Sequence, residues 1–159
     1  SYKKIENWIN NFSIDGIIMS GGNDIGEMPQ RDLTENCLIN WAKKKQIPLL
    51  GICRGAQMIF KHFGGEIESV TNHVNVKHEL IFDSSQENFP KFTTFYYKNG
   101  LRKCPKNLKV IARSGQGQIE AIAHRKLKWE GWMWHPEREK DVSNICSQRF
   151  KNLVSLEKK

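Results

Sequence analysis

A cysteine between two glycines is the first candidate for chemistry in this 159-residue chain. Cys53 lies in GICRG, with Gly51 and Gly55 two residues to either side, after an apolar segment and before a helical pattern. This is the spacing of a nucleophile elbow, a strand-to-helix turn too tight for larger side chains. A helix N-terminus would lower the pKa of the thiol and stabilise an oxyanion. The alternative is a packed cysteine beside glycines that only end the strand.

The segment MWHPE supplies the helpers that a thiol nucleophile needs, namely a base and an acceptor that orients it. We expect a strand that ends at His135, with Pro136 stopping it. Strand alternation would then turn Glu137 to the same side as His135, within reach of its ring. The alternative is a packed or capping histidine after a tryptophan-rich strand.

A third candidate is the glycine pair in SGGND, residues 20–24. Gly21 and Gly22 follow the apolar segment IIM, and glycines there free backbone N–H groups to point at a ligand. Alone, such a pair indicates only a turn. All three motifs, however, follow predicted strands, and open α/β sheets bind ligands at the carboxyl ends of their strands.

The elements that must position these motifs alternate in the first part of the chain. We expect strands at IIM and IPLLGIC. Helices are marked by apolar residues at helical spacing: Ile5, Trp8, Ile9 and Phe12; Leu33, Cys37, Leu38, Trp41 and Ala42; and Ala56, Ile59, Phe60 and Phe63. Gly64 and Gly65 would end the third helix with a left-handed cap. The pattern predicts an α/β fold, with a mostly parallel open sheet and helices on both faces.

The pattern changes after Glu66. LKVIARS and QIEAIAHR flank Gly115-Gln116-Gly117 and predict a small antiparallel hairpin region. A last helix is marked by Val142, Ile145, Cys146, Arg149, Phe150 and Leu153. The stretch 83–104 has no clear period and yields no assignment.

Composition narrows the classes of protein. A hydrophobic content of 38% and a charged content of 26% fit one globular domain. No apolar run approaches the roughly 18 residues of a membrane span, and the N-terminal SYKKIENWIN has no signal-peptide pattern. The 4 cysteines form no CxxC pair, which predicts neither a zinc site nor a disulfide framework and favours the cytoplasm. The net charge of +8 comes from dispersed lysines, so we expect no nucleic-acid partner, although an anionic small substrate fits.

Taken in order, GGND, GICRGAQ and WHPERE resemble the class I glutamine amidotransferase-like superfamily, and more narrowly its γ-glutamyl hydrolase branch. The segment RDLTENCLINWAKKKQIPLLGICRGAQMI is similar to that branch almost without interruption. It includes Arg54, where synthetase-coupled amidotransferases carry an apolar or aromatic residue. Within the branch, the details are most similar to γ-glutamyl-CDP-amidate hydrolases of capsule phosphoramidate biosynthesis. The resemblance implies a flavodoxin-like three-layer architecture, as a single domain over residues 1–159.

The resemblance also implies a reaction: hydrolysis of a γ-glutamyl amide through a γ-glutamyl thioester, which releases glutamate and an amine, with a nucleotide phosphoramidate as one candidate. The implied partner is a small γ-glutamyl conjugate, with a homodimer as one possible assembly and with no cofactor or metal. The implied roles are Cys53 as nucleophile, His135 as base, Glu137 as its orienter, Gly22 and Arg54 as oxyanion donors, and Gly21 and Gln57 as substrate contacts.

The chain departs from the family pattern in two places. The family begins with a strand and a helix ahead of the stretch equivalent to Ser1, so we expect an N-terminally short domain without the first strand. A segment of the Asn-Ser-x-His type, which helps to hold glutamate, is replaced by TTFYYKNGL. Two other functions stay open: a glutaminase subunit that delivers ammonia to a synthetase, and an inactive or truncated homologue that acts as a binding protein. An unrelated thiol peptidase would use the same triad chemistry with a different strand order.

Overall fold

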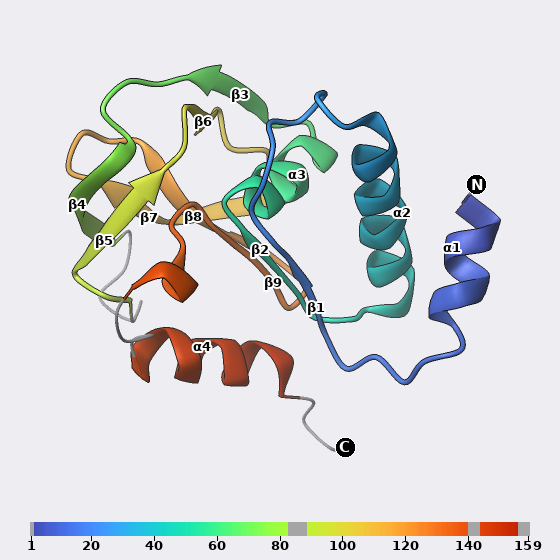
Figure 1. Cartoon of the computed structure of the whole chain (residues 1–159). Coiled ribbons are helices and arrows are strands. Elements are labelled where there is room, and N and C mark those ends of the chain that lie inside the picture. The colour runs from blue at the N-terminus through green and yellow to red at the C-terminus, as the bar shows by residue number, and fades with distance from the viewer. Residues whose placement is uncertain (1, 83–88, 140–143, 156–159) are drawn as a thin grey trace.

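The computed structural model describes residues 2–82, 89–139 and 144–155. Helices and strands alternate in the first part of the chain, and strands dominate the later part (Figure 1). In chain order the elements are α1 (Tyr2–Ile9), β1 (Ile17–Met19), α2 (Pro29–Lys45), β2 (Leu49–Ile52), α3 (Arg54–His62), β3 (Glu66–Ser69), β4 (Val74–Phe82), β5 (Phe92–Tyr96), β6 (Asn99–Arg102), β7 (Leu108–Ser114), β8 (Ile119–His124), β9 (Trp129–Trp132), the 3-10 turn η1 (Pro136–Arg138) and α4 (Asn144–Val154).

The described strands form one curled sheet in the order β1-β2-β9-β8-β7-β4-β5, with β3 paired to β6 and β6 also paired to β8. The pairs β1–β2 and β2–β9 are parallel, and the other pairs are antiparallel. The predicted α/β class is confirmed, but the antiparallel part is larger than the small hairpin region that the sequence indicates. Most of β4 is at least partly exposed, with only Leu80 fully buried, so its apolar pattern is too weak to read from sequence.

Helices lie on both faces of the parallel strands, as predicted, with α2 and α3 on one side and α4 on the other (Figure 1). The close approach of α3 depends on glycine. A Cβ at Gly51 would lie 2.4 Å from the carbonyl carbon of Gly55, and one at Gly131 would lie 2.9 Å from the Cβ of Ala56. On the opposite face, Ile18, Leu50 and other side chains line a hollow of about 320 Å³ beside α4.

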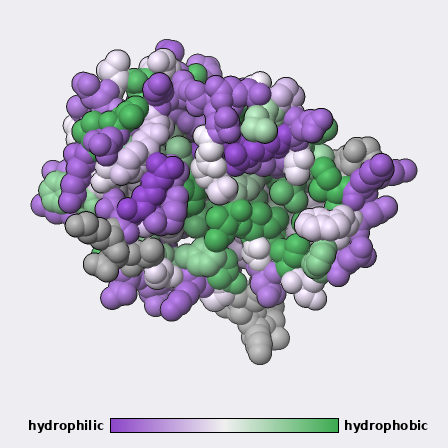
Figure 2. Space-filling view, viewed as in Figure 1, coloured by the Kyte–Doolittle hydropathy of each residue, from purple (hydrophilic) through white to green (hydrophobic). Residues whose placement is uncertain are grey.

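The first helix packs on α2 rather than on the sheet. The indole N–H of Trp41 donates to Oδ1 of Asn10 at 3.0 Å. Of the apolar residues that predict this helix, Ile9 is buried, whereas Trp8 is 61% exposed and Phe12, beyond the helix end, is also exposed. Apolar side chains therefore appear on the face of the molecule seen in Figure 2. The predicted buried stripe is correct only in part, because α1 meets its neighbour along one narrow side.

Two predicted turns are confirmed. Gly64, with a φ of 86°, and Gly65 cap α3, and the N–H of Gly65 donates to the carbonyl of Phe60 at 2.9 Å. The hairpin of β7 and β8 closes through Gly117, whose φ is 87°. The last helix is also present as α4, although Val142 lies outside the described residues.

One predicted boundary is wrong. The strand expected to end at His135 is β9, and it ends at Trp132. At the next residue, the N–H of Met133 donates to the carbonyl of Glu120 at 2.8 Å, and the chain then leaves the ladder for the turn η1. The indoles of Trp132 and Trp134 stack in this segment, with ring centroids 5.5 Å apart and planes inclined by 5°. Aromatic packing, rather than strand pairing, therefore fixes the approach to His135.

Among the described helices, none is both long and apolar enough to cross a bilayer.

Candidate active site

Cys53 occupies the sharp turn between β2 and α3. Its φ of 49° and ψ of −103° are strained for a residue with a side chain, and its N–H donates to the carbonyl of Trp132 at 2.7 Å. A Cβ at Gly55 would lie 2.1 Å from the carbonyl oxygen of Met19, so no other residue fits there. This is the backbone geometry of a nucleophile elbow.

The environment of the thiol differs from the expectation. Burial raises the pKa of Cys53 to about 11, and it outweighs the Arg54 N–H directed at the sulfur and the charge of Arg138, which both lower it. The carboxylates of Glu137 and Asp24 add to the increase. The predicted lowering of the thiol pKa is therefore wrong for this state of the protein, because the helix N-terminus is weaker than desolvation.

His135 and Glu137 meet as the sequence suggests, by a different route. Nδ1 of His135 lies 2.6 Å from Oε1 of Glu137. The 3-10 turn η1 brings the carboxylate back, instead of strand alternation. His135 is buried, whereas the Glu137 side chain is 57% exposed. Among the hydrogen bonds of the described residues, none joins the His135 ring to the sulfur of Cys53.

The glycine pair after β1 lies against this histidine. A Cβ at Gly21 would lie 2.5 Å from Cε1 of His135, so only glycine leaves room for the ring. A Cβ at Gly22 would lie 2.2 Å from a guanidinium nitrogen of Arg31, and its φ of 150° also suits glycine. The parallel registers of β1, β2 and β9 thus bring all three motifs to the same edge of the sheet.

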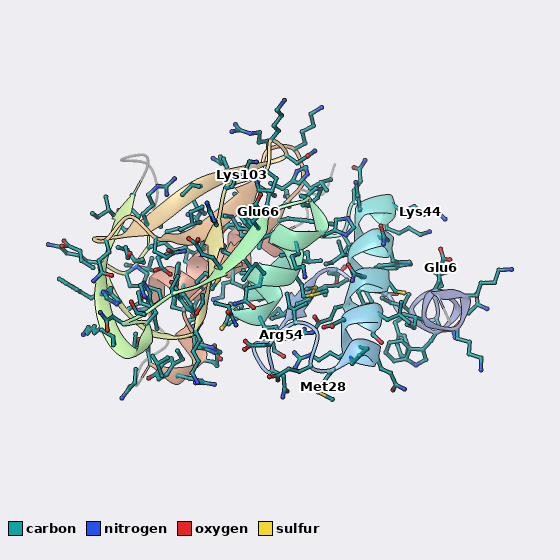
Figure 3. The ribbon with its side chains drawn as sticks, turned by 90° about the horizontal axis from the view of Figure 1, so that it is seen from above. Glu6, Met28, Lys44, Arg54, Glu66 and Lys103 are labelled. Atoms are coloured by element: carbon teal, nitrogen blue, oxygen red, sulfur yellow. The ribbon has the colours of Figure 1, made fainter. Side chains whose placement is uncertain are left out.

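The other two predicted site residues are engaged within the protein. The Arg54 side chain is only 1% exposed, and it reaches from α3 toward α2 (Figure 3), where it forms ion pairs with Asp32 and Glu35. Gln57 is buried, and its Nε2 donates to the carbonyl of Asn99 at 2.7 Å. Only the backbone N–H of Arg54 faces the thiol.

Sequence analysis missed a buried polar cluster formed by Tyr97, Glu120 and His73. The hydroxyl of Tyr97 donates to Oε1 of Glu120 at 2.7 Å, and Nε2 of His73 lies 3.4 Å from the same oxygen. Burial raises the pKa of Glu120, and this carboxylate raises the pKa of His73. Burial also raises the pKa of Tyr97, and the nearby thiol of Cys53 contributes to that increase. The only sequence signal was an acid inside the apolar hairpin segment QIEAIAH.

A second missed group is cationic. The guanidinium of Arg138 lies over the ring of Tyr96, 4.8 Å from its centroid, and the Tyr96 ring is 5.9 Å from that of His135. An exposed positive charge therefore stands beside the candidate base.

The described residues contain no group of three or more His, Cys, Asp and Glu side chains arranged to hold a metal ion.

Comparison with known proteins assigns the family. Residues 1–149 match the model of the family "Glutamine amidotransferase class-I". The chain belongs to this family. The predicted resemblance is thereby confirmed at the family level.

Two relatives represent two branches of the family. The chain is 37% identical, over 90% of its length and 71% of the relative's, to a gamma-glutamyl-CDP-amidate hydrolase of Campylobacter jejuni subsp. jejuni serotype O:2. It is 30% identical, over 92% of its length and 78% of the relative's, to a glutamine-hydrolyzing GMP synthase subunit of Archaeoglobus fulgidus.

A solved structure shares the fold. The crystal structure of a GMP synthase subunit from Thermoplasma acidophilum superposes with a TM-score of 0.74 at 23% identity, and the match covers 91% of this chain and 73% of that one. This agrees with the flavodoxin-like architecture that the resemblance implies.

Proposed function

We propose that this protein hydrolyses the γ-glutamyl amide bond of a small conjugate through a thioester on Cys53. The observation that carries the proposal is the meeting of the strained Cys53 turn, the His135–Glu137 pair and the Gly21–Gly22 loop at one edge of the sheet. The family and the 37% identical hydrolase support the same chemistry.

The reaction begins with the neutral thiol, because its raised pKa leaves little thiolate at neutral pH. His135 removes the proton as the sulfur attacks the γ-carbonyl, and Glu137 holds the imidazole through Nδ1. The N–H groups of Gly22 and Arg54 stabilise the resulting oxyanion.

The tetrahedral species collapses when the C–N bond breaks, and His135 returns its proton to the departing amine. Water then attacks the thioester and glutamate leaves. Gly21 and Gln57 complete the γ-glutamyl pocket, with the Gln57 amide oriented by its bond to Asn99.

Charge beside the site favours an anionic leaving group. Arg138 is exposed next to His135, and the whole chain carries a net charge of +8. A nucleotide phosphoramidate, as in the name of the Campylobacter relative, fits this field better than ammonia from glutamine does. Steering of this kind weakens with salt, because charges are screened beyond about 8–10 Å at physiological ionic strength.

The test is glutamate release from a panel of γ-glutamyl conjugates, at low and high salt, without any added protein. Release should be fastest for phosphoramidates and should fall at high salt. Cys53→Ala should reduce release by at least about 10⁴-fold, as loss of a catalytic nucleophile does. Its thermal midpoint should stay within about 2 °C of the native value, since one small side chain is lost. Release that survives in Cys53→Ala would refute the thioester route.

The second candidate is a glutaminase subunit that delivers ammonia to a synthetase. Its support is the similarity to the GMP synthase subunit of Archaeoglobus fulgidus over most of the chain. Glutamine hydrolysis that appears only after addition of a synthetase would establish this function instead. A folded chain with no release under either condition would indicate an inactive homologue that acts as a binding protein.

A further inference from the structure

Helix α2 contributes an arginine that the reaction above does not use. Arg31 donates through one terminal nitrogen to the carbonyls of Ser20 at 3.2 Å and Gly21 at 3.0 Å. Its guanidinium covers Gly22 so closely that a Cβ there would collide with it. Arg31 therefore clamps the backbone of the loop that holds a proposed oxyanion donor.

This clamp sets the direction of one N–H group. The carbonyl of Gly21 and the N–H of Gly22 belong to a single peptide unit, and the described chain contains no cis peptide bond. In a trans peptide the C=O and the N–H point in opposite directions. Because Arg31 fixes the carbonyl toward α2, the N–H of Gly22 is held pointing away from α2.

A single carboxylate links this clamp to the other donor. Nε of Arg31 donates to Oε1 of Glu35 at 2.8 Å, while Oε2 of Glu35 accepts from Arg54. Arg54 is the first residue of α3, and its backbone N–H is directed at the sulfur of Cys53. Asp32 holds the same guanidinium from the next turn of α2.

We infer that Arg31 and Glu35 are positioning residues that orient both oxyanion donors relative to Cys53. The inference rests on the proposed function for the identity of these donors. Arg31 acts on Gly22 through the shared peptide unit, and Glu35 ties Arg31 to Arg54 so that the two donors keep their separation. Neither side chain touches the substrate.

The test compares two reactions of the same thiol. Acylation of Cys53 by p-nitrophenyl acetate forms the S–C bond and expels nitrophenolate through an oxyanion, with the thiol proton passing to His135. Alkylation by iodoacetamide also uses the sulfur but displaces iodide from a saturated carbon, so no oxyanion forms. The ratio of the two rates therefore reports on oxyanion stabilisation alone, independently of thiol accessibility.

We expect Arg31→Met to slow acylation at least about tenfold, since loss of a whole oxyanion donor costs about 10²–10³-fold. Alkylation should change by less than about twofold. Arg31→Lys, which keeps a cationic donor, should recover most of the acylation rate. Glu35→Gln should fall between Arg31→Met and the native chain. The matched control is Arg102→Met, which removes an exposed arginine paired with Glu68 and should alter neither rate.

Equal losses of acylation and alkylation in Arg31→Met would overturn the inference, as would an unchanged ratio or a native chain with no Cys53-dependent acylation. Thermal unfolding of each variant identifies any that fail to fold, and Arg31→Lys then decides the outcome. Since p-nitrophenyl acetate contains no γ-glutamyl group, the ratio remains measurable even if glutamate release fails. The two proposals can therefore fail separately.

Discussion

Two buried polar clusters flank Cys53, and they are held together in opposite ways. Arg54, Asp32 and Glu35 form the first, where a cation that proteins never deprotonate faces two carboxylates. Tyr97, Glu120 and His73 form the second, where a fully buried acid has only a hydroxyl and a titratable ring as partners. The first compensates its charge permanently, whereas the second favours a bound proton. Removal of one partner should therefore affect the two clusters differently.

Breaking the first cluster should have the larger effect on stability. Glu35→Ala leaves the buried Arg54 cation with Asp32 alone, and loss of one partner of a buried ion pair costs about 3–4 kcal/mol. Urea unfolding at pH 7 measures this loss. The control is Glu79→Ala, which removes a half-exposed partner of Lys91 and should change the free energy of unfolding by less than about 0.5 kcal/mol. A loss below about 1 kcal/mol in Glu35→Ala would show that the cluster contributes little.

The thiol between the clusters should respond to pH over a wide range. Because burial raises the pKa of Cys53 to about 11, the thiolate fraction should increase about tenfold per pH unit between pH 7 and 10. Mass spectrometry of iodoacetamide labelling at Cys53 gives the rate at each pH. A plateau below pH 9 would show that the helix N-terminus and Arg138 prevail over desolvation.

The second cluster should give a smaller effect that depends on pH. The raised pKa values of Glu120 and His73 mean that the folded protein binds more protons than the unfolded chain. The Glu120 contribution to stability is present below pH 4.5, and that of His73 below pH 6.5; each is lost as pH rises through the folded-state pKa. The native free energy of unfolding should therefore decline between pH 6 and 8.

Glu120→Gln should flatten this decline by roughly 1 kcal/mol, since it removes both the titrating acid and the carboxylate that raises the pKa of His73. Urea unfolding at a series of pH values measures the slope, and Glu79→Gln serves as the exposed control. A native stability that rises across this window, or a slope unchanged in Glu120→Gln, would contradict the assignment of a bound proton to this cluster.

The same contrast explains what the sequence could predict. The glycines beside Cys53, the pair Gly21–Gly22 and the segment HPE are local patterns, and each lies at the end of a strand that its apolar residues predict. Parallel pairing then brings them together without further information. The fold class and the candidate site on β1, β2 and β9 were therefore accessible from residue types and spacing.

The clusters were not accessible in this way. Arg31, Glu35 and Tyr97 read as ordinary surface or loop residues until the fold places them against partners distant in sequence. The sign of the Cys53 pKa shift also depends on burial, which spacing does not report. Strands β3 to β6 lacked a readable pattern because many of their side chains are exposed.

The stacked indoles of Trp132 and Trp134 give the protein an optical property of its own. Two nearly parallel chromophores 5.5 Å apart couple their excited states, so their circular dichroism depends on the angle and spacing between the rings. Trp134 directly precedes His135 in the chain. Any displacement of the segment that carries the histidine would change the coupling and thus the ultraviolet spectrum. The chain therefore carries a built-in spectroscopic ruler one residue away from its candidate base.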